Sequence, residues 1–248
     1  MYKYPIIEKI RKKHNDTTDI NLINKEFSEE LKHTRFLGMG NPPESGVFLL
    51  YYFRQENKLS RELFIHSHQI FSQSGGNNGA ILRENDVKRY IYIDDLCGSG
   101  TQAIDYSEDI LENIKKLNPE VEVDYYVLFS TTKGLNNVRD YKKFNRVECI
   151  FELDDSYKCL ENDSRYFANI DANIDASKGV CRDFARRMCK EYGKMLSPKY
   201  PLGYGDCQLL MAFNYNTPDN SLPIFWYDGE YHNNVRWIPV FKRYDKIY

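Results

Sequence analysis

Two neighbouring acidic residues and the glycine-containing turn that follows them are the part of the sequence best suited to chemistry. Asp94 and Asp95 directly follow the apolar run 90–93, whose β-branched and aromatic residues are typical of a buried strand in a parallel sheet. The turn 97–101 comes next, with the sequence CGSGT. Apolar residues at helical spacing then predict an amphipathic helix over 103–117. The order is therefore strand, acidic pair, turn and helix.

This order of elements favours a phosphorylated sugar as ligand. Glycines let the backbone approach a ligand closely, and the first N–H groups of a helix favour a bound phosphate. Asp94 and Asp95 stand about where a sugar attached to that phosphate would lie. They can accept hydrogen bonds from two ribose hydroxyls, directly or through Mg²⁺, and can stabilise positive charge at the anomeric carbon. The predicted phosphate-binding residues are Gly98, Ser99, Gly100, Thr101 and Gln102. An ordinary strand-to-helix turn is the alternative explanation of the same local pattern.

At these positions the sequence resembles the type I phosphoribosyltransferases, whose motif for phosphoribosyl diphosphate (PRPP) is four apolar residues, two acids and a Thr-Gly-x-Thr loop. Residues 90–95 and Ser99–Gly100 fall on matching positions. Gln102 departs from the motif, because the family usually has its second hydroxyl residue there. The motif occurs together with GMGNPPESG at 38–46, PLGYGDCQLL at 201–210 and NTPDNSLPIFW at 216–226. With these segments, the chain after about residue 35 resembles the phosphoribosyltransferase-like family associated with bacterial conflict (defence) systems.

The resemblance implies a type I phosphoribosyltransferase fold and a reaction. The expected reaction is magnesium-dependent transfer of the phosphoribosyl group from PRPP to an acceptor, with Asp94 and Asp95 as the catalytic and Mg²⁺-binding residues. In phosphoribosyltransferases an early loop holds the pyrophosphate, and the order of elements assigns that role to Gly40, Ser45 and Gly46.

The resemblance also implies a setting. Relatives near defence genes, including reverse-transcriptase (retron) loci, suggest an effector of anti-phage defence. They also suggest partners encoded nearby, among them a reverse transcriptase with its nucleic acid. A homo-oligomer is a separate expectation, and the sequence leaves the oligomeric state open. The alternative is a catalytically inactive sensor or assembly component that binds PRPP or a nucleotide, a reading motivated by Gln102. Whether the chain is an enzyme stays open on sequence grounds. A P-loop nucleotidase is disfavoured, because GSGTQ lacks the lysine of such a loop.

Composition restricts the remaining classes of protein. The 248 residues include 34 basic and 36 acidic ones, so net charge gives no reason to expect nucleic-acid or membrane binding. An N-terminal apolar run too short for a signal peptide, and the lack of a stretch of about eighteen apolar residues, predict a cytoplasmic protein without a membrane segment. Six scattered cysteines show no metal-binding spacing and are expected to be reduced thiols.

Strand and helix patterns alternate along the chain. Strands are expected at 121–130 and 147–155 with a helix between them, and this alternation predicts an α/β fold with a mostly parallel sheet flanked by helices. We expect a helical N-terminal extension over 1–33 and a phosphoribosyltransferase-like domain over 34–248. Ligands of such sheets bind beyond the carboxyl ends of the strands. This topology predicts that an acceptor-binding rim is formed by Lys133, Asp154 and Asp155.

The other segments carry weaker expectations. Residues 63–71 read as a strand or a buried helix end, and residues 72–80 as a mobile cover of the site or a disordered connection. A helix is expected over 178–195. Strand-like runs at 208–214 and 222–226, with an apolar strand or edge within 235–244, are expected to complete the sheet as a C-terminal β cap.

Overall fold

The computed structural model of the chain describes residues 2–40, 45–73, 79–167, 181–232 and 235–244. The chain groups into two compact units, of which the first comprises residues 1–129 and 135–151 and the second residues 130–134 and 152–248. No helix in the described ranges is long and apolar enough to cross a membrane. The division between an extension and a domain at residue 33 stays a prediction.

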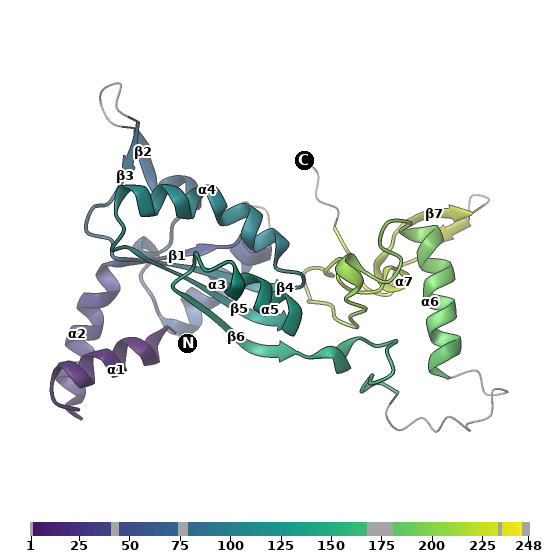
Figure 1. Cartoon of the computed structure of the whole chain (residues 1–248), viewed down its shortest axis with the longest axis horizontal. Helices are drawn as coiled ribbons and strands as arrows, with labels where there is room; N and C mark the ends of the chain where they lie inside the picture. Colours follow the sequence, from purple (N-terminus) through teal and green to yellow (C-terminus); the bar gives the residue numbers. More distant parts are fainter. Residues whose placement is uncertain (1, 41–44, 74–78, 168–180, 233–234, 245–248) are drawn as a thin grey trace. The chain divides into compact units, whose positions relative to one another are not determined.

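A four-stranded parallel sheet forms the centre of the first unit (Figure 1). Its strands lie in the order β1 (Thr34–Gly38), β4 (Arg89–Cys97), β5 (Glu122–Thr131) and β6 (Arg146–Leu153). β1 and β4 pair from Thr34 opposite Arg89 to Gly38 opposite Ile93. The α/β fold with a parallel sheet is therefore confirmed, and the strands expected at 121–130 and 147–155 are present as β5 and β6.

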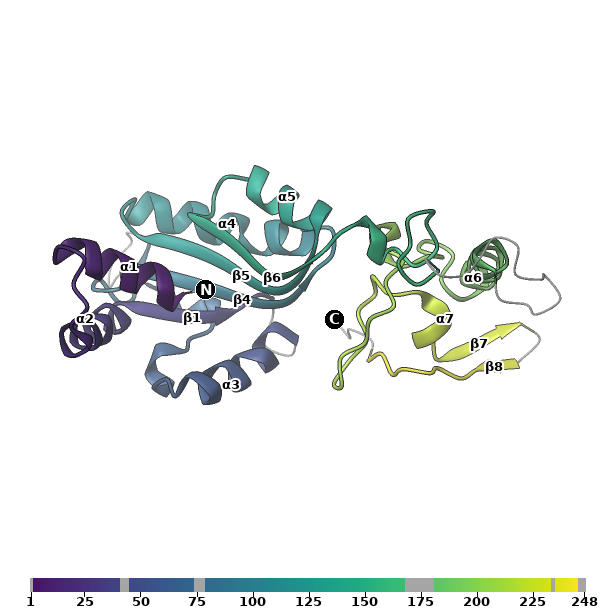
Figure 2. The same ribbon diagram turned by 90° about the horizontal axis from the view of Figure 1, so that it is seen from below.

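Helices cover both faces of this sheet (Figure 2). α4 (Thr101–Leu117) and α5 (Thr132–Asp140) lie on one face, while α3 (Ser45–Asn57) lies on the other, where α1 (Lys3–Lys13) also packs. Because successive side chains of a strand point to opposite faces, β4 contributes to two cores. Tyr90 and Tyr92 pack in the core that includes α4, and Ile91 and Ile93 in the core that includes α1.

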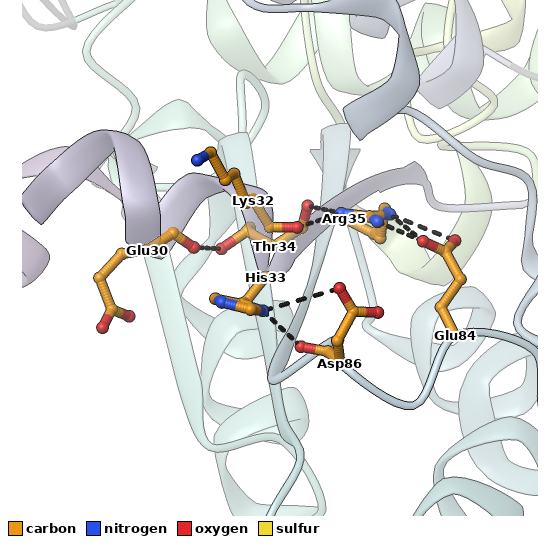
Figure 3. Close-up of polar contacts among 7 residues, drawn as sticks. All are labelled: Glu30, Lys32, His33, Thr34, Arg35, Glu84 and Asp86. Atoms are coloured by element: carbon orange, nitrogen blue, oxygen red, sulfur yellow. Dashed lines mark hydrogen bonds and ion pairs between the residues drawn. The ribbon is translucent and has the colours of Figure 1, made fainter.

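The expected helical N-terminus consists of α1 and α2 (Ile20–Lys32). Asp19 caps α2 by accepting hydrogen bonds from the backbone N–H groups of Asn21 and Leu22. The chain then enters β1 through a polar cluster shown in Figure 3. Arg35, which is 8% exposed, binds the carboxylate of Glu84 and donates to the carbonyl oxygens of Lys32 and Thr34 at 2.7 and 2.9 Å.

Loss of this buried guanidinium is expected to destabilise the first unit. Arg35→Met leaves the carboxylate of Glu84 and two carbonyl oxygens without their donor, and we expect a loss of about 3 kcal/mol in the free energy of unfolding. Lys12→Met is the control, because the ion pair of Lys12 with Glu8 is exposed to solvent and contributes little to stability. Urea unfolding of both variants measures the difference, and equal stability would contradict the anchoring role of Arg35.

The segment after α3 differs from expectation. Instead of a continuous strand or helix end, residues 63–71 contain the last residue of the 3₁₀ turn η1 (Arg61–Leu63), the whole of a second 3₁₀ turn, η2 (Ser67–Gln69), and the first residue of β2 (Phe71–Gln73). Only one parallel bridge, from Phe64 to Phe36, joins the segment to β1. The apolar residues Leu63 and Phe64 are used to cover the edge of the core rather than to extend the sheet. β2 pairs with β3 (Ala80–Leu82) in a hairpin whose tip, 74–78, lies outside the described residues.

The second unit contains α6 (Arg182–Leu196). This helix covers most of the expected range 178–195 and ends one residue beyond it, while residues 178–180 lie outside the described ranges. Its short elements are η3 (Asp155–Tyr157), η5 (Tyr204–Asp206) and α7 (Pro223–Trp226). The strand expected at 222–226 is thus wrong, because Pro223 occupies the first position of a helical turn, where its missing N–H costs nothing. The run 208–214 forms only a bridge from Leu209 to Ser221. The C-terminal β structure is a hairpin of β7 (Gly229–His232) and β8 (Val235–Trp237), which forms a two-stranded sheet of its own and does not complete the central sheet as expected.

Candidate functional site

The acidic pair lies in β4, just beyond the stretch that pairs with β1. Both side chains are buried, with Asp94 8% and Asp95 5% exposed. As neighbours on a strand, they point to opposite faces of the sheet. Asp94 faces the side of α4, where it meets Tyr125 of β5, and Asp95 therefore faces the side of α3. The two carboxylates consequently have different surroundings, which the sequence pattern does not indicate.

Both carboxylate oxygens of Asp94 accept hydrogen bonds from within the protein. The hydroxyl of Tyr125 donates to Oδ2 at 2.7 Å, and the backbone N–H of Asp95 donates to Oδ1 at 2.9 Å. Burial raises the pKa of Asp94 well above the usual value, and the charge of Asp95 raises it further, against the effect of the two hydrogen bonds. Tyr125, also fully buried, has a raised pKa because of burial and the nearby Asp94. Tyr125 thus holds one carboxylate of the pair in a fixed orientation.

The raised pKa has a consequence for stability. The folded protein holds the proton of Asp94 more tightly than the unfolded chain, so ionisation of Asp94 lowers the stability as the pH rises above the usual aspartate pKa. Asp94→Asn removes this charge and can keep both contacts, since an amide can accept from the Asp95 N–H and donate to the Tyr125 oxygen. We expect the variant to gain stability over the wild type as the pH rises from about 4 to 8. The gain in the free energy of unfolding should be at most about 1.4 kcal/mol for each pH unit. Urea unfolding across this range measures the gain, and a difference that does not change with pH would contradict it.

The turn between β4 and α4 has the form that the sequence predicts. Gly100 is the residue before the helix and has a φ of 82°, a left-handed conformation that glycine adopts without strain. Ser99 Oγ accepts from the backbone N–H of Thr101 at 3.3 Å, and the side-chain amide of Asn137 donates to the carbonyl of Ser99 at 2.9 Å. Gln102 is exposed in the first turn of α4. α5, which carries Asn137, therefore fixes the turn from the side.

The expected pyrophosphate loop is described only in part, since residues 41–44 lie outside the described ranges. Gly40 is buried and has a φ of 98°. Ser45 is the first residue of α3. Gly46 lies so close to the ends of β1 and β4 that a Cβ there would stand 2.6 Å from the carbonyl oxygen of Met39 and 3.3 Å from that of Ile93. The N-terminus of α3 is thereby placed at the carboxyl ends of these two strands.

The arrangement brings two helix N-termini to adjacent strand ends. α3 begins beside the end of β1, α4 begins beyond the end of β4, and Asp94 and Asp95 lie between them in sequence and structure. Backbone N–H groups at both helix starts favour anions, while the carboxylates suit hydroxyl groups or a cation between the anions. In the described part of the chain, no group of three or more His, Cys, Asp or Glu side chains could hold a metal ion by itself.

The expected acceptor rim belongs to the second unit and stays a prediction. Asp154 caps η3, accepting hydrogen bonds from Ser156, and these bonds hold its pKa below the usual value. Asp155 forms an exposed pair with Lys158 at 3.4 Å. Lys133, the remaining residue of that rim, is exposed.

Two residues of the site are absent from the sequence-based expectation. Tyr125 lies in a strand that the sequence predicts. The alternation of side chains along this strand gives the face on which Tyr125 lies. The pairing of β5 with β4, which brings Tyr125 to Asp94, does not follow from the sequence. Asn137 gives no signal, because a polar residue in a helix usually faces solvent. Both act on residues that were predicted, Asp94 and Ser99.

The fold and the site together define a phosphoribosyltransferase-like α/β protein. The chain belongs to the PRTase-CE family, whose model matches residues 3–243. The resemblance noted in the sequence is thus confirmed at the level of the family. A comparison with curated proteins gives no significant match.

Solved structures similar to the chain include two phosphoribosyltransferases. Orotate phosphoribosyltransferase from Aeropyrum pernix is 11% identical with a TM-score of 0.31, and the match covers 50% of this chain and 61% of that chain. Xanthine-guanine-hypoxanthine phosphoribosyltransferase from Helicobacter pylori is 15% identical with a TM-score of 0.29, and the match covers 54% of this chain and 85% of that chain. At these scores the family model, rather than either structure, supports the assignment.

Proposed function

We propose that the protein binds PRPP with Mg²⁺ and transfers its phosphoribosyl group to an acceptor. The observation that carries this proposal is the pair of helix N-termini, of α3 and α4, on either side of Asp94 and Asp95. PRPP carries two anionic groups separated by a ribose, and its charges match two anion sites separated by carboxylates.

Each part of the ligand then has a binding element. The turn and first residues of α4, from Gly98 to Gln102, bind the 5′-phosphate. The start of α3, with Gly40, Ser45 and Gly46, binds the pyrophosphate. Asp95 accepts hydrogen bonds from the ribose hydroxyls, and Asp94, held by Tyr125, fixes the strand end beside it.

Mg²⁺ fits this site as a partner of the ligand. The protein offers two carboxylates, and both already accept hydrogen bonds within the protein, Asp94 from Tyr125 and the Asp95 N–H and Asp95 from the Leu96 N–H, so the remaining oxygen ligands would come from the diphosphate, the ribose and water. When bound, Mg²⁺ would neutralise charge on the departing pyrophosphate.

The chemistry breaks the bond between C1 of the ribose and the pyrophosphate oxygen, and the bonding electrons leave with the pyrophosphate. A nitrogen or oxygen of the acceptor forms the new bond to C1, and its proton passes to solvent. The carboxylates stabilise the positive charge that develops at C1 during this exchange. Lys133, Asp154 and Asp155 remain our candidates for contacts to the acceptor.

Magnesium-dependent release of pyrophosphate from PRPP by the purified protein tests the proposal. Release is measured with and without a pool of bases, nucleotides and nucleic acids, since the acceptor is unidentified. Release above the background supports a transferase. No release and no stabilisation of the protein by PRPP with Mg²⁺ would overturn the proposal.

The second candidate function is a non-catalytic sensor that binds PRPP or a nucleotide. Two observations favour it: Gln102 stands where a hydroxyl residue is usual, and both oxygens of Asp94 are already engaged. Thermal stabilisation by PRPP without pyrophosphate release would support this second candidate over the first.

We also propose a role as an effector or component of a bacterial defence system, working in the cytoplasm with protein partners encoded nearby, such as a reverse transcriptase with its nucleic acid. This rests on the resemblance of the sequence motifs. Expression in bacteria with and without the neighbouring genes tests it: growth arrest relieved by a neighbour supports the role, and equal growth under phage challenge opposes it.

A further inference from the structure

A small pocket lies at the amino ends of the strands, at the end of the sheet opposite the candidate site. Arg89 begins β4 and Arg146 begins β6, while Asp124 is the third residue of β5, so all three lie where the parallel strands start. α1 closes the pocket with residues that include Ile6 and Lys9. The pocket has an empty volume of about 250 Å³, part of it open to solvent, and its narrow interior leaves room for about one water molecule.

A buried carboxylate in this pocket has an oxygen without a partner. Asp124 is 2% exposed, and its Oδ2 accepts a hydrogen bond from the hydroxyl of Tyr126 at 3.0 Å. Its Oδ1 is buried, and no donor among the described residues reaches it. A buried acceptor left in this state costs about 1–3 kcal/mol, so the fold retains it against its own stability. Burial raises the pKa of Asp124, which shows the same penalty.

Of the three basic residues that line the pocket, Arg89 is paired with an acidic residue, whereas Lys9 and Arg146 are not paired within the described residues. Arg89 is bound to Glu122, with Nε 2.8 Å from the carboxylate, and lies 3.9 Å from Asp124 Oδ2. Lys9 and Arg146 are exposed at the rim, and no salt bridge within the described parts of the chain holds either. The pocket therefore combines a deep acceptor with two available cations at its mouth.

We propose that this pocket is a second binding site, for a compact anion that carries an amino group. The amino group, about the size of a water molecule, donates to Asp124 Oδ1 inside the pocket. The anionic group lies at the rim between Lys9 and Arg146, and the side chain of Ile6 packs against the carbon framework. An α-amino acid, with its carboxylate, and a nucleotide with an amino-bearing base, with its phosphate, share this chemistry. The site is independent of the proposed transfer of phosphoribosyl groups.

Calorimetric titration of the full chain tests the proposal with two sets of probes: a panel of L-amino acids, and the monophosphates AMP, CMP and GMP. The matched comparisons lack the amino group: the corresponding 2-hydroxy acid for each amino acid, such as lactate for alanine, UMP for CMP, and IMP for AMP and GMP. We expect one member of either set to bind at least about tenfold more tightly than its amino-free counterpart. Which set contains that member identifies the source of the anion.

Variants assign the binding to this pocket. Asp124→Asn places an amide at the carboxylate position, and Lys9→Gln with Arg146→Gln removes the two exposed cations without touching the core. Each is expected to weaken binding at least about tenfold. Lys12→Gln with Lys116→Gln makes the same charge change elsewhere and is expected to leave binding unchanged. The Asp94→Asn, Asp95→Asn double variant is also expected to bind as the wild type, which separates this pocket from the PRPP site.

Three results would overturn the proposal: no binding of either set of probes, equal binding of the amino-free compounds, or equal binding by the wild type and the rim variant. If Asp124→Asn does not fold, the rim variant still decides the question, because Lys9 and Arg146 are exposed.

Discussion

Replacing Asp94 and Asp95 together by asparagine is expected to abolish magnesium-dependent release of pyrophosphate from PRPP, with a loss of about 10³-fold or more. Loss of one preorganised electrostatic group in an active site typically costs about 10²–10³-fold, and this variant removes two. The fold should persist, because asparagine has nearly the same shape and both residues are buried acids whose charge is costly there.

The control for this loss is the double variant Asp105→Asn, Asp109→Asn. These residues are exposed on α4, so the variant makes the same chemical change and the same change of net charge outside the site. It should keep wild-type activity. Release by the Asp94, Asp95 variant at the wild-type rate would show that the site has been assigned to the wrong residues. The single variants separate the roles, since Asp95→Asn should weaken ligand binding more than Asp94→Asn if Asp94 serves mainly to hold the strand end.

Gly46→Ala is expected to destabilise the first unit by about 3 kcal/mol and to weaken PRPP binding at least about tenfold. The new methyl carbon would stand 2.6 Å from the carbonyl oxygen and 3.1 Å from the nitrogen of Met39, both backbone atoms. These atoms cannot turn away as a side chain can. α3 must therefore move outward from β1 and β4, and its N-terminus, which we assign to the pyrophosphate, moves with it.

Gly79→Ala is the matched control for this prediction. Gly79 has a φ of 81°, so alanine is disfavoured there, but a Cβ would meet no atom within 4 Å. Its cost should be about 1 kcal/mol, from the backbone conformation alone. Urea unfolding and PRPP titration of both variants measure the contrast. A Gly46→Ala protein as stable as the Gly79→Ala protein would disprove the close approach of α3 to the strands.

The centre of the fold was predictable because its signals are local. The apolar run 90–93, the acidic pair and the glycine turn each follow from neighbouring residues, but β4 continues through the acidic pair to Cys97 instead of ending before it, and only then come the turn and α4. The left-handed conformation of Gly100 agrees with the use of glycine before the helix. Where local propensity and the tertiary fold point the same way, sequence patterns are reliable.

Other features depend on contacts between distant segments. Tyr125 reaches Asp94 across 31 positions of sequence, and this contact follows from the pairing of two strands rather than from either strand alone. The run 222–226 has strand-like composition, yet Pro223 begins a helical turn in the packed second unit. Likewise, the need for glycine at position 46 comes from the backbone of Met39 and Ile93, which no motif records.

The opposite orientations of Asp124 and Tyr125 limit the tolerance of β5 to insertion and deletion. Asp124 and Tyr125 are adjacent, and they face opposite sides of the sheet, the first into the pocket under α1 and the second toward Asp94. A strand repeats every two residues, so gaining or losing a single residue in this part of β5 would exchange the two faces. The phenol of Tyr125 would then face the side of α1, and the carboxylate of Asp124 the side of α4. We therefore expect natural length variation among related sequences to spare this strand and to fall in the loops around it.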